Sequence, residues 1–202
     1  AFVDCASITF NKIAFRLERP KTIEPARYEK WWSSPRFTAT KANGFHHIRF
    51  TYCSFSGFTD ELAFRRSDSF NSQELSGSFV AFDHCVIGPP VLGLVPERRE
   101  HNMCMSCSRV DDVDLSNNVF IGANRRSPQI QGKRARIHGA LIAGHGSSAI
   151  YLHAGTTCHI QNVRFVAPHG RYFPVSAVAG TSISDYGRHG KIGIFISSNT
   201  FE

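Results

Sequence analysis

A short pattern of apolar positions recurs seven times along the chain. In each copy the first, third and eighth residues are apolar, and the sixth is small or similar to asparagine. The copies start at Ile8, Ile48, Val80, Val113, Ala135, Cys158 and Ile194. The closest pair of starts, Val113 and Ala135, lies 22 residues apart (135 − 113). A unit this short cannot bury its own apolar face, so the pattern predicts a solenoid whose copies stack on one another.

The spacing inside each copy predicts a strand, a tight bend and a second strand. The first two apolar positions are two residues apart, which is the period of a strand with one face inward. The next inward position comes three residues later, so the chain must turn there through a residue outside the β region. Asparagine tolerates positive φ better than most residues, and Asn117-Asn118 and Ser198-Asn199 stand at this corner in two copies.

The sequence therefore predicts an all-β fold, a right-handed parallel β-helix of about seven or eight rungs with a third side of variable length. One interior file is predicted to contain Phe10, Phe50, Phe82, Leu115, Ile137, Ile160 and Ile196. A β-sandwich is the alternative, because it also has many short strands separated by turns. The hairpin turns that a sandwich needs often contain Asn-Gly, and Asn43-Gly44 is the only such pair in the chain.

The length of 202 residues predicts one domain, 1–202, with a sizeable core. Long insertions at about 19–35, 88–100 and 167–190 are expected to project from one edge, where solenoids often bind ligands. Trp31 and Trp32 in the first insertion are candidates to stack on sugar rings or bases; the alternative is that one packs against the coil. No apolar run reaches the ~18 residues of a membrane span. No polar cap precedes the first copy, so either earlier rungs or a partner is expected to cover that end.

The net charge is +7, and arginines supply most of it at several paired positions. Arginine suits bidentate binding of carboxylates and phosphates. We therefore expect a polyanionic partner: an acidic polysaccharide, a nucleic acid or an anionic lipid surface. The alternative is that solvated arginines keep a flat β surface soluble.

Three of the six cysteines, Cys53, Cys85 and Cys158, fall on inward positions of the repeat. This favours buried thiols that act as small apolar side chains. Cys53 and Cys85 occupy the same position in successive copies, so stacking would also bring them into disulfide range. Residue type alone leaves both interpretations open.

Three segments carry a family resemblance. Residues 47–61 read HIRFTYCSFSGFTDE, residues 101–103 read HNM and residues 124–132 read NRRSPQIQG. In this order they resemble the bacterial pectate lyases of the parallel β-helix class, which have Asp-His-Cys-Ser-Phe-Ser before Trp-Gly-Thr-Asp-Glu, then His-Ser-Met-Gly, then Asn-x-Arg-x-Pro-Arg-Ile-x-Gly. The resemblance runs over roughly residues 7–165.

The resemblance implies binding and cleavage of an acidic (uronate) polysaccharide by calcium-assisted β-elimination. Calcium draws charge from the sugar carboxylate and acidifies the neighbouring C–H bond. By the resemblance, Arg126 takes the proton, in a cationic site that lowers its pKa. The implied Ca²⁺ ligands are Asp60 and Glu61, joined by Asp83 from the next copy.

The same resemblance implies substrate contacts at Arg125, Gln129 and His101. The chain also departs from the family pattern. Thr51 stands where the family has the aspartate of Asp-His-Cys, and Gln129 stands where it has a second arginine. Calcium favours several oxygen ligands, commonly carboxylates, so the missing aspartate weakens the implied site.

These departures support two further hypotheses. In one, a degenerate, non-catalytic lyase fold is a structural or binding subunit of a larger assembly, whether organellar, ribonucleoprotein or viral. In the other, the chain is a glycan-binding module without chemistry. For Asp60 and Glu61 the alternative role is a solvated loop pair, and for Arg126 it is to hold a strand corner. An active lyase is expected to be extracellular, and a structural subunit intracellular or organellar.

Overall fold

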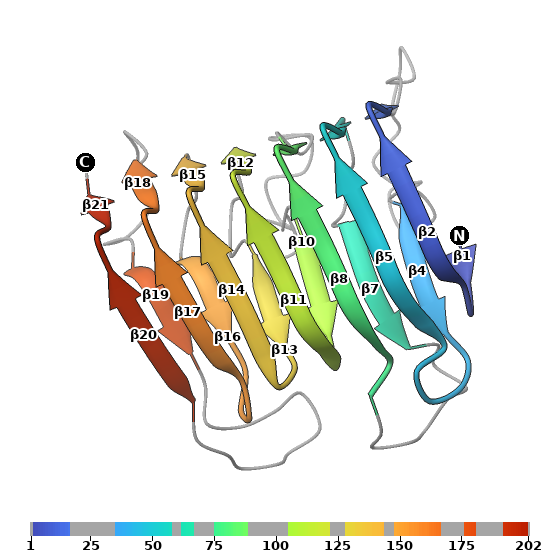
Figure 1. Ribbon diagram of the computed structural model, residues 1–202. Coiled ribbons are helices and arrows are strands. Elements are labelled where there is room, and N and C mark those ends of the chain that lie inside the picture. Colours follow the sequence, from blue (N-terminus) through green and yellow to red (C-terminus); the bar gives the residue numbers. More distant parts are fainter. Residues whose placement is uncertain are drawn as a thin grey trace, which may run out of the picture.

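The computed structural model describes residues 2–16, 35–57, 62–66, 75–88, 105–121, 128–143, 148–166, 176–180 and 192–201. Within these ranges the chain forms strands and no helix. The strands belong to three seven-stranded sheets, and every strand pair in them is parallel (Figure 1). The parallel β-helix is therefore confirmed, and the β-sandwich alternative is excluded.

Each rung contributes one strand to each sheet. Sheet A contains β1 (Phe2–Val3), β4 (Arg36–Ala39), β7 (Leu62–Arg66), β10 (Met105–Ser108), β13 (Gln129–Gln131), β16 (Ser148–Leu152) and β19 (Ser176–Gly180). Sheet B contains β2 (Ala6–Asn11), β5 (Phe45–Thr51), β8 (Gly77–Asp83), β11 (Val110–Ser116), β14 (Arg134–His138), β17 (Thr157–Gln161) and β20 (Gly193–Ser197). Sheet C contains β3 (Ala14–Arg16), β6 (Ser54–Ser56), β9 (Val86–Ile87), β12 (Val119–Ile121), β15 (Leu141–Ala143), β18 (Arg164–Val166) and β21 (Thr200–Phe201).

The rungs are numbered 1 to 7 from the N-terminus. In Figure 1 the chain ascends sheet B on the near side and descends sheet A on the far side while it advances from the N-terminal to the C-terminal rung, which is the right-handed sense. This is the hand that parallel crossover connections take almost without exception. The predicted insertion at 167–190 is not a single loop, because strand β19 of sheet A lies inside it.

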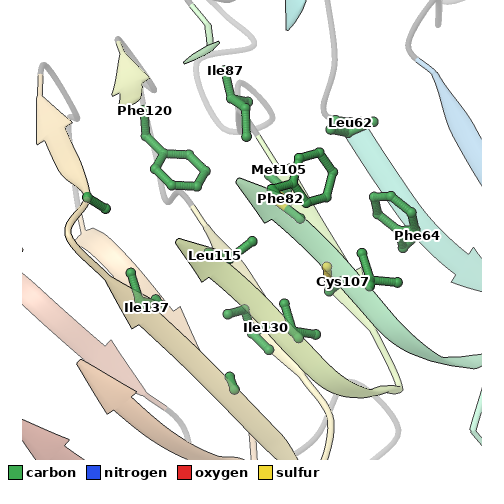
Figure 2. Close-up of a cluster of buried hydrophobic side chains, with 14 of the residues drawn as sticks. Leu62, Phe64, Phe82, Ile87, Met105, Cys107, Leu115, Phe120, Ile130 and Ile137 are labelled. Atoms are coloured by element: carbon green, nitrogen blue, oxygen red, sulfur yellow. The ribbon is translucent and has the colours of Figure 1, made fainter. Parts of the chain in front are cut away.

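The predicted interior file is confirmed by the strand register. Phe10 pairs with Phe50, Phe50 with Phe82, and the alignment continues through every rung to Ile196. Figure 2 shows such side chains from all three sheets converging on the space between them. In the first rung Ile13, and in the last rung Ile196 and Phe201, are exposed, since a neighbouring rung covers each from one side only.

The bend between sheets B and C has the same length in all seven rungs. Two residues separate the strands, and the first of them has positive φ: Lys12, Tyr52, His84, Asn117, Gly139, Asn162 and Ser198. The sequence predicted the bend from the three-residue step between the second and third inward positions. Asparagine, however, is only one of several residues that occupy the first position of the bend. The joins from sheet C to sheet A, in contrast, range from four residues (144–147) to nineteen (17–35).

The second residue of the bend points inward and bonds to the rung before it. Asn118 accepts a hydrogen bond from the Cys85 amide (2.8 Å) and donates one to the Phe82 carbonyl (2.9 Å). Asn199 repeats this arrangement in the last rung. At the same position Cys53 donates weakly to the Phe10 carbonyl (3.5 Å), and the Cys53 amide donates to the Cys85 sulfur (3.4 Å). Each of these two cysteines therefore makes one of the two inter-rung hydrogen bonds that asparagine makes at this position.

The described cysteines are free thiols, and all except Cys5 are buried. Burial raises the pKa of Cys85 to about 11 and that of Cys158 to about 12, so both stay protonated at neutral pH. The interpretation as small apolar side chains is confirmed for Cys53, Cys85 and Cys158. Within the described ranges, no helix is long and apolar enough to cross a bilayer.

Candidate functional site

Most of the predicted site residues lie outside the described residues. These are Trp31, Trp32, Asp60, Glu61, His101, Arg125 and Arg126. Gln129 begins β13 in sheet A, and Asp83 ends β8 in sheet B, so the structure places these two residues on different sheets.

The carboxylate of Asp83 already has two polar neighbours. His84 Nδ1 lies 2.8 Å from Asp83 Oδ1, and Asn117 Nδ2 donates to the same oxygen at 3.0 Å. Thr51 and Ser116 flank Asp83 in the register, and neither adds a carboxylate. No cluster of three or more His, Cys, Asp or Glu side chains suited to a metal occurs among the residues that the structure describes. These residues alone do not fit a calcium site, and the calcium prediction depends on Asp60 and Glu61.

The described residues form an open groove on the outer face of sheet B. One part, of about 290 Å³, is lined from Ser7 to Ala81, and an adjoining part, of about 540 Å³, continues to His159. The two parts share Arg49, Phe79 and Ala81. Together they cross rungs 1 to 6, which corresponds to a length of about 24 Å at the ~4.8 Å spacing of neighbouring strands.

The groove lies beside a backbone kink. In the first four rungs one residue inside the sheet B strand has positive φ: Ser7, His47, Phe79 and Asp112. The register skips this residue in each strand, so the ladder stays aligned on both sides of it. A residue in this conformation bends the strand, much as the extra residue of a β-bulge does. The kink is absent at the equivalent residues Arg134 and Thr157, which lie inside the continuous register of β14 and β17.

Opposite charges face each other at the boundary between β11, the last strand with the kink, and β14, the first strand without it. Rung 4 carries Asp111 and Asp112, and rung 5 carries Lys133 and Arg134 opposite them. Arg134 donates to Asp112 through both Nε and Nη2, and this hydrogen bonding holds the Asp112 pKa below its ordinary value. Lys133 Nζ lies 3.7 Å from Asp111 Oδ2. These groups largely neutralise one another.

Other polar groups of the groove are available to a ligand. Arg49 and Arg136 are exposed and form no ion pair with any described residue. Phe79 is 49% exposed and stacks against the His47 ring at a centroid distance of 4.6 Å. The groove thus combines guanidinium groups, a carboxylate at Asp114 and an aromatic face.

Sequence reasoning did not identify this groove. The arginines were counted only as part of the basic composition, and neither Arg49 nor Phe79 was singled out. A usable signal was present, because the residue between the first two inward positions of each copy must face outward. Across the copies this position reads Thr9, Arg49, Ala81, Asp114, Arg136, His159 and Phe195.

Comparison of the chain with protein-family models, with curated proteins and with solved structures finds no match. The functional argument therefore depends on the chemistry of the groove.

Proposed function

We propose that this protein binds an acidic polysaccharide along the outer face of sheet B. The observation that carries the proposal is the open groove across six rungs with Arg49 and Arg136 exposed in it. A groove of this shape suits an extended polymer better than a compact small molecule. Neighbouring rungs are about 4.8 Å apart, which is close to the length of one pyranose residue, so successive sugars meet successive strands.

The side chains supply the interactions that an acidic sugar chain needs. A guanidinium group binds a carboxylate or a sulfate through two parallel hydrogen bonds. The exposed ring of Phe79 offers an apolar surface to the C–H face of a sugar. The net charge of +7 adds a long-range attraction for anionic polymers, and salt weakens this attraction.

Cleavage of the polymer is a separate hypothesis, implied by the resemblance to pectate lyases. It requires Arg126 as the base and calcium at Asp60 and Glu61. Incubation with polyuronate and calcium would then yield an unsaturated product that absorbs in the ultraviolet, and Arg126→Ala would abolish this signal. Persistence of the signal in that variant would reject Arg126 as the base.

Binding is tested by calorimetry with acidic oligosaccharides of about eight sugars, at low and moderate salt. The double substitution Arg49→Ala/Arg136→Ala should weaken binding about tenfold or more, since a hydrogen bond to a charged group is worth about 1.5 kcal/mol or more. The control is Lys12→Ala/Arg16→Ala, which removes the same charge from exposed positions outside the groove.

The control should lose only the small contribution of net charge, which disappears at moderate salt. Equal losses in the two double variants would mean that the groove has no specific role, and unchanged binding in the groove variant would reject the proposal. Circular dichroism and thermal unfolding establish that both variants are folded.

A further inference from the structure

The order of charges along the groove is not uniform. From rung 2 to rung 6, the central outward position reads Arg49, Ala81, Asp114, Arg136 and His159, and the register aligns these residues in one row. Two basic side chains are thus separated by an apolar rung and an acidic rung. The distance between the strands of Arg49 and Arg136 corresponds to three rung steps, or about 14 Å.

Asp114 is the acidic group in this row. Its Oδ1 accepts a hydrogen bond from the Ser116 hydroxyl, and the carboxylate lines the groove. An ionised carboxylate has about four acceptor positions, so Asp114 retains capacity to accept hydrogen bonds from a ligand. Arg136, in the next strand, supplies donors beside it. Adjacent acceptors and donors of this kind suit the hydroxyl groups of a neutral sugar.

A uronate in the same place would meet a like charge. Its carboxylate would lie within a few ångströms of Asp114, where two negative charges repel by about 1 kcal/mol in water and by more near a protein surface. In rung 3, next to Asp114, the groove is lined by the small side chain of Ala81 and by the exposed ring of Phe79. Rungs 3 and 4 therefore favour uncharged sugars, whereas rungs 2 and 5 favour acidic ones.

We propose that the ligand of the groove is a glycan in which acidic sugars are separated by neutral sugars, with a neutral sugar over Asp114. This inference rests on the proposed function and names the substrate class of that same groove. It distinguishes the ligand from a homopolymer of uronates, which carries a charge on every sugar.

The test compares two ligands with equal numbers of sugars. Oligogalacturonate has a carboxylate on every sugar. The second ligand is a synthetic partial methyl ester of the same chain, in which every third carboxylate is free, so that acidic sugars can lie over Arg49 and Arg136 and neutral sugars over Ala81 and Asp114. Net electrostatic attraction alone would make the more highly charged oligogalacturonate bind more tightly. The proposal expects the opposite order, with the partial ester binding about threefold more tightly or better, because it keeps both arginine contacts and avoids the unfavourable charge contact at Asp114.

The substitution Asp114→Asn removes the repulsion and keeps the side-chain shape. It should tighten oligogalacturonate binding about threefold or more and shift the ratio of the two affinities toward the homopolymer. The matched control is Asp4→Asn, which makes the same charge change at a carboxylate that bonds to Thr40 outside the groove. This control should leave the ratio of affinities unchanged.

Tighter binding of oligogalacturonate by the unaltered protein, or a ratio that Asp114→Asn and Asp4→Asn change equally, would overturn the inference while the proposed function stands. Absence of binding to both glycans would instead overturn the proposed function itself, so the two failures are distinguishable.

Discussion

The early rungs and the late rungs are built on one repeat, yet they differ in the core and in the backbone. In rungs 1 to 3, phenylalanine rings form stacked columns: Phe10 to Phe50 to Phe82 in sheet B, with centroid distances of 4.8 and 4.5 Å, and Phe37 to Phe64 in sheet A at 4.7 Å. In rung 5 the inward positions are aliphatic: Ile130, Ala135, Ile137, Ala140 and Ile142. In rungs 6 and 7 a stacked pair occurs in sheet C, Phe165 with Phe201, whereas the sheet B file stays aliphatic.

The backbone changes along with the core. Strands β5, β8 and β11 have seven residues and contain the kink, whereas β14, β17 and β20 have five and do not. The longer strands begin with additional buried residues, Phe45, Gly77 and Val110. A solenoid can therefore change its cross-section along its axis, provided that every rung of a block makes the same change and the register is kept.

The largest expected effect is in the aromatic block. Phe50 contacts the rings of Phe10, Phe37 and Phe82, among others. Phe50→Ala should lower the free energy of unfolding by about 4–5 kcal/mol, against about 3 kcal/mol for Ile137→Ala, because ring pairs add to the loss of buried area. Denaturant unfolding measures both.

The substitution Phe50→Leu isolates the contribution of the ring, since it removes the ring and keeps an apolar side chain. It should destabilise by about 1–2 kcal/mol, whereas the volume-conserving change Ile137→Leu should stay below about 1.5 kcal/mol. Equal losses at the two positions would show that ring stacking adds nothing to the early rungs.

Glycine in the longer strands offers the next test. A Cβ at Gly77 would lie 2.2 Å from the Phe45 ring and 2.3 Å from the Phe45 carbonyl oxygen, and the carbonyl belongs to the paired strand. Gly77→Ala should therefore destabilise by about 3 kcal/mol, at the upper end of overpacking effects. Gly155 has open space around it but a φ of +86°, so Gly155→Ala should cost only about 1 kcal/mol. The reverse order in thermal unfolding would contradict this account of the close packing.

The bend tests whether asparagine and cysteine are equivalent. Asn118→Ala leaves the Cys85 amide and the Phe82 carbonyl without their partner, which should destabilise by about 2–3 kcal/mol. Asn118→Cys should recover part of this loss, because Cys53 makes the equivalent donation in rung 2 and Cys85 makes the equivalent acceptance in rung 3. A cysteine variant no more stable than the alanine variant would reject the equivalence.

The smallest effect is expected at the junction of the two blocks, where Arg134 bonds to Asp112. This bond lowers the Asp112 pKa, so its contribution to stability is present above the aspartate's unfolded-state pKa and is lost as pH falls through the folded-state value. Arg134→Ala should therefore be less stable than the unaltered protein at pH 7, and the difference should narrow toward pH 3. A constant difference across this range would show that the charge pair is not responsible.

The fold was predictable because burial imposes a strict pattern on the chain. Inward residues such as Phe10 and Ile160 must be apolar in every rung, so the solenoid, its files and its bends are all visible in the sequence. The strands of sheet A were less visible, since joins of variable length displace them from the repeat.

The kink and the groove were not predicted, and the reason is physical. Ser7, His47, Phe79 and Asp112 share a backbone conformation but no side-chain property, so their composition carries no signal. Outward positions are free of packing constraints, and only their alignment across rungs reveals the row from Arg49 to Arg136. Most of the predicted site residues, including the predicted base Arg126, lie outside the described residues, and their roles stay predictions.

The constant two-residue bend and the variable join from sheet C to sheet A have a consequence for protein engineering. Differences in length fall at the two corners beside sheet A, since the joins from sheet A to sheet B also range from one residue (109) to twelve (181–192). At the corner from sheet C to sheet A, four residues and nineteen residues serve the same connection. A foreign peptide grafted at that corner, for example within 144–147, would leave the strand register of neighbouring coils untouched. The architecture thus offers a ladder of attachment points at fixed intervals, on which several peptides could be displayed in a chosen order.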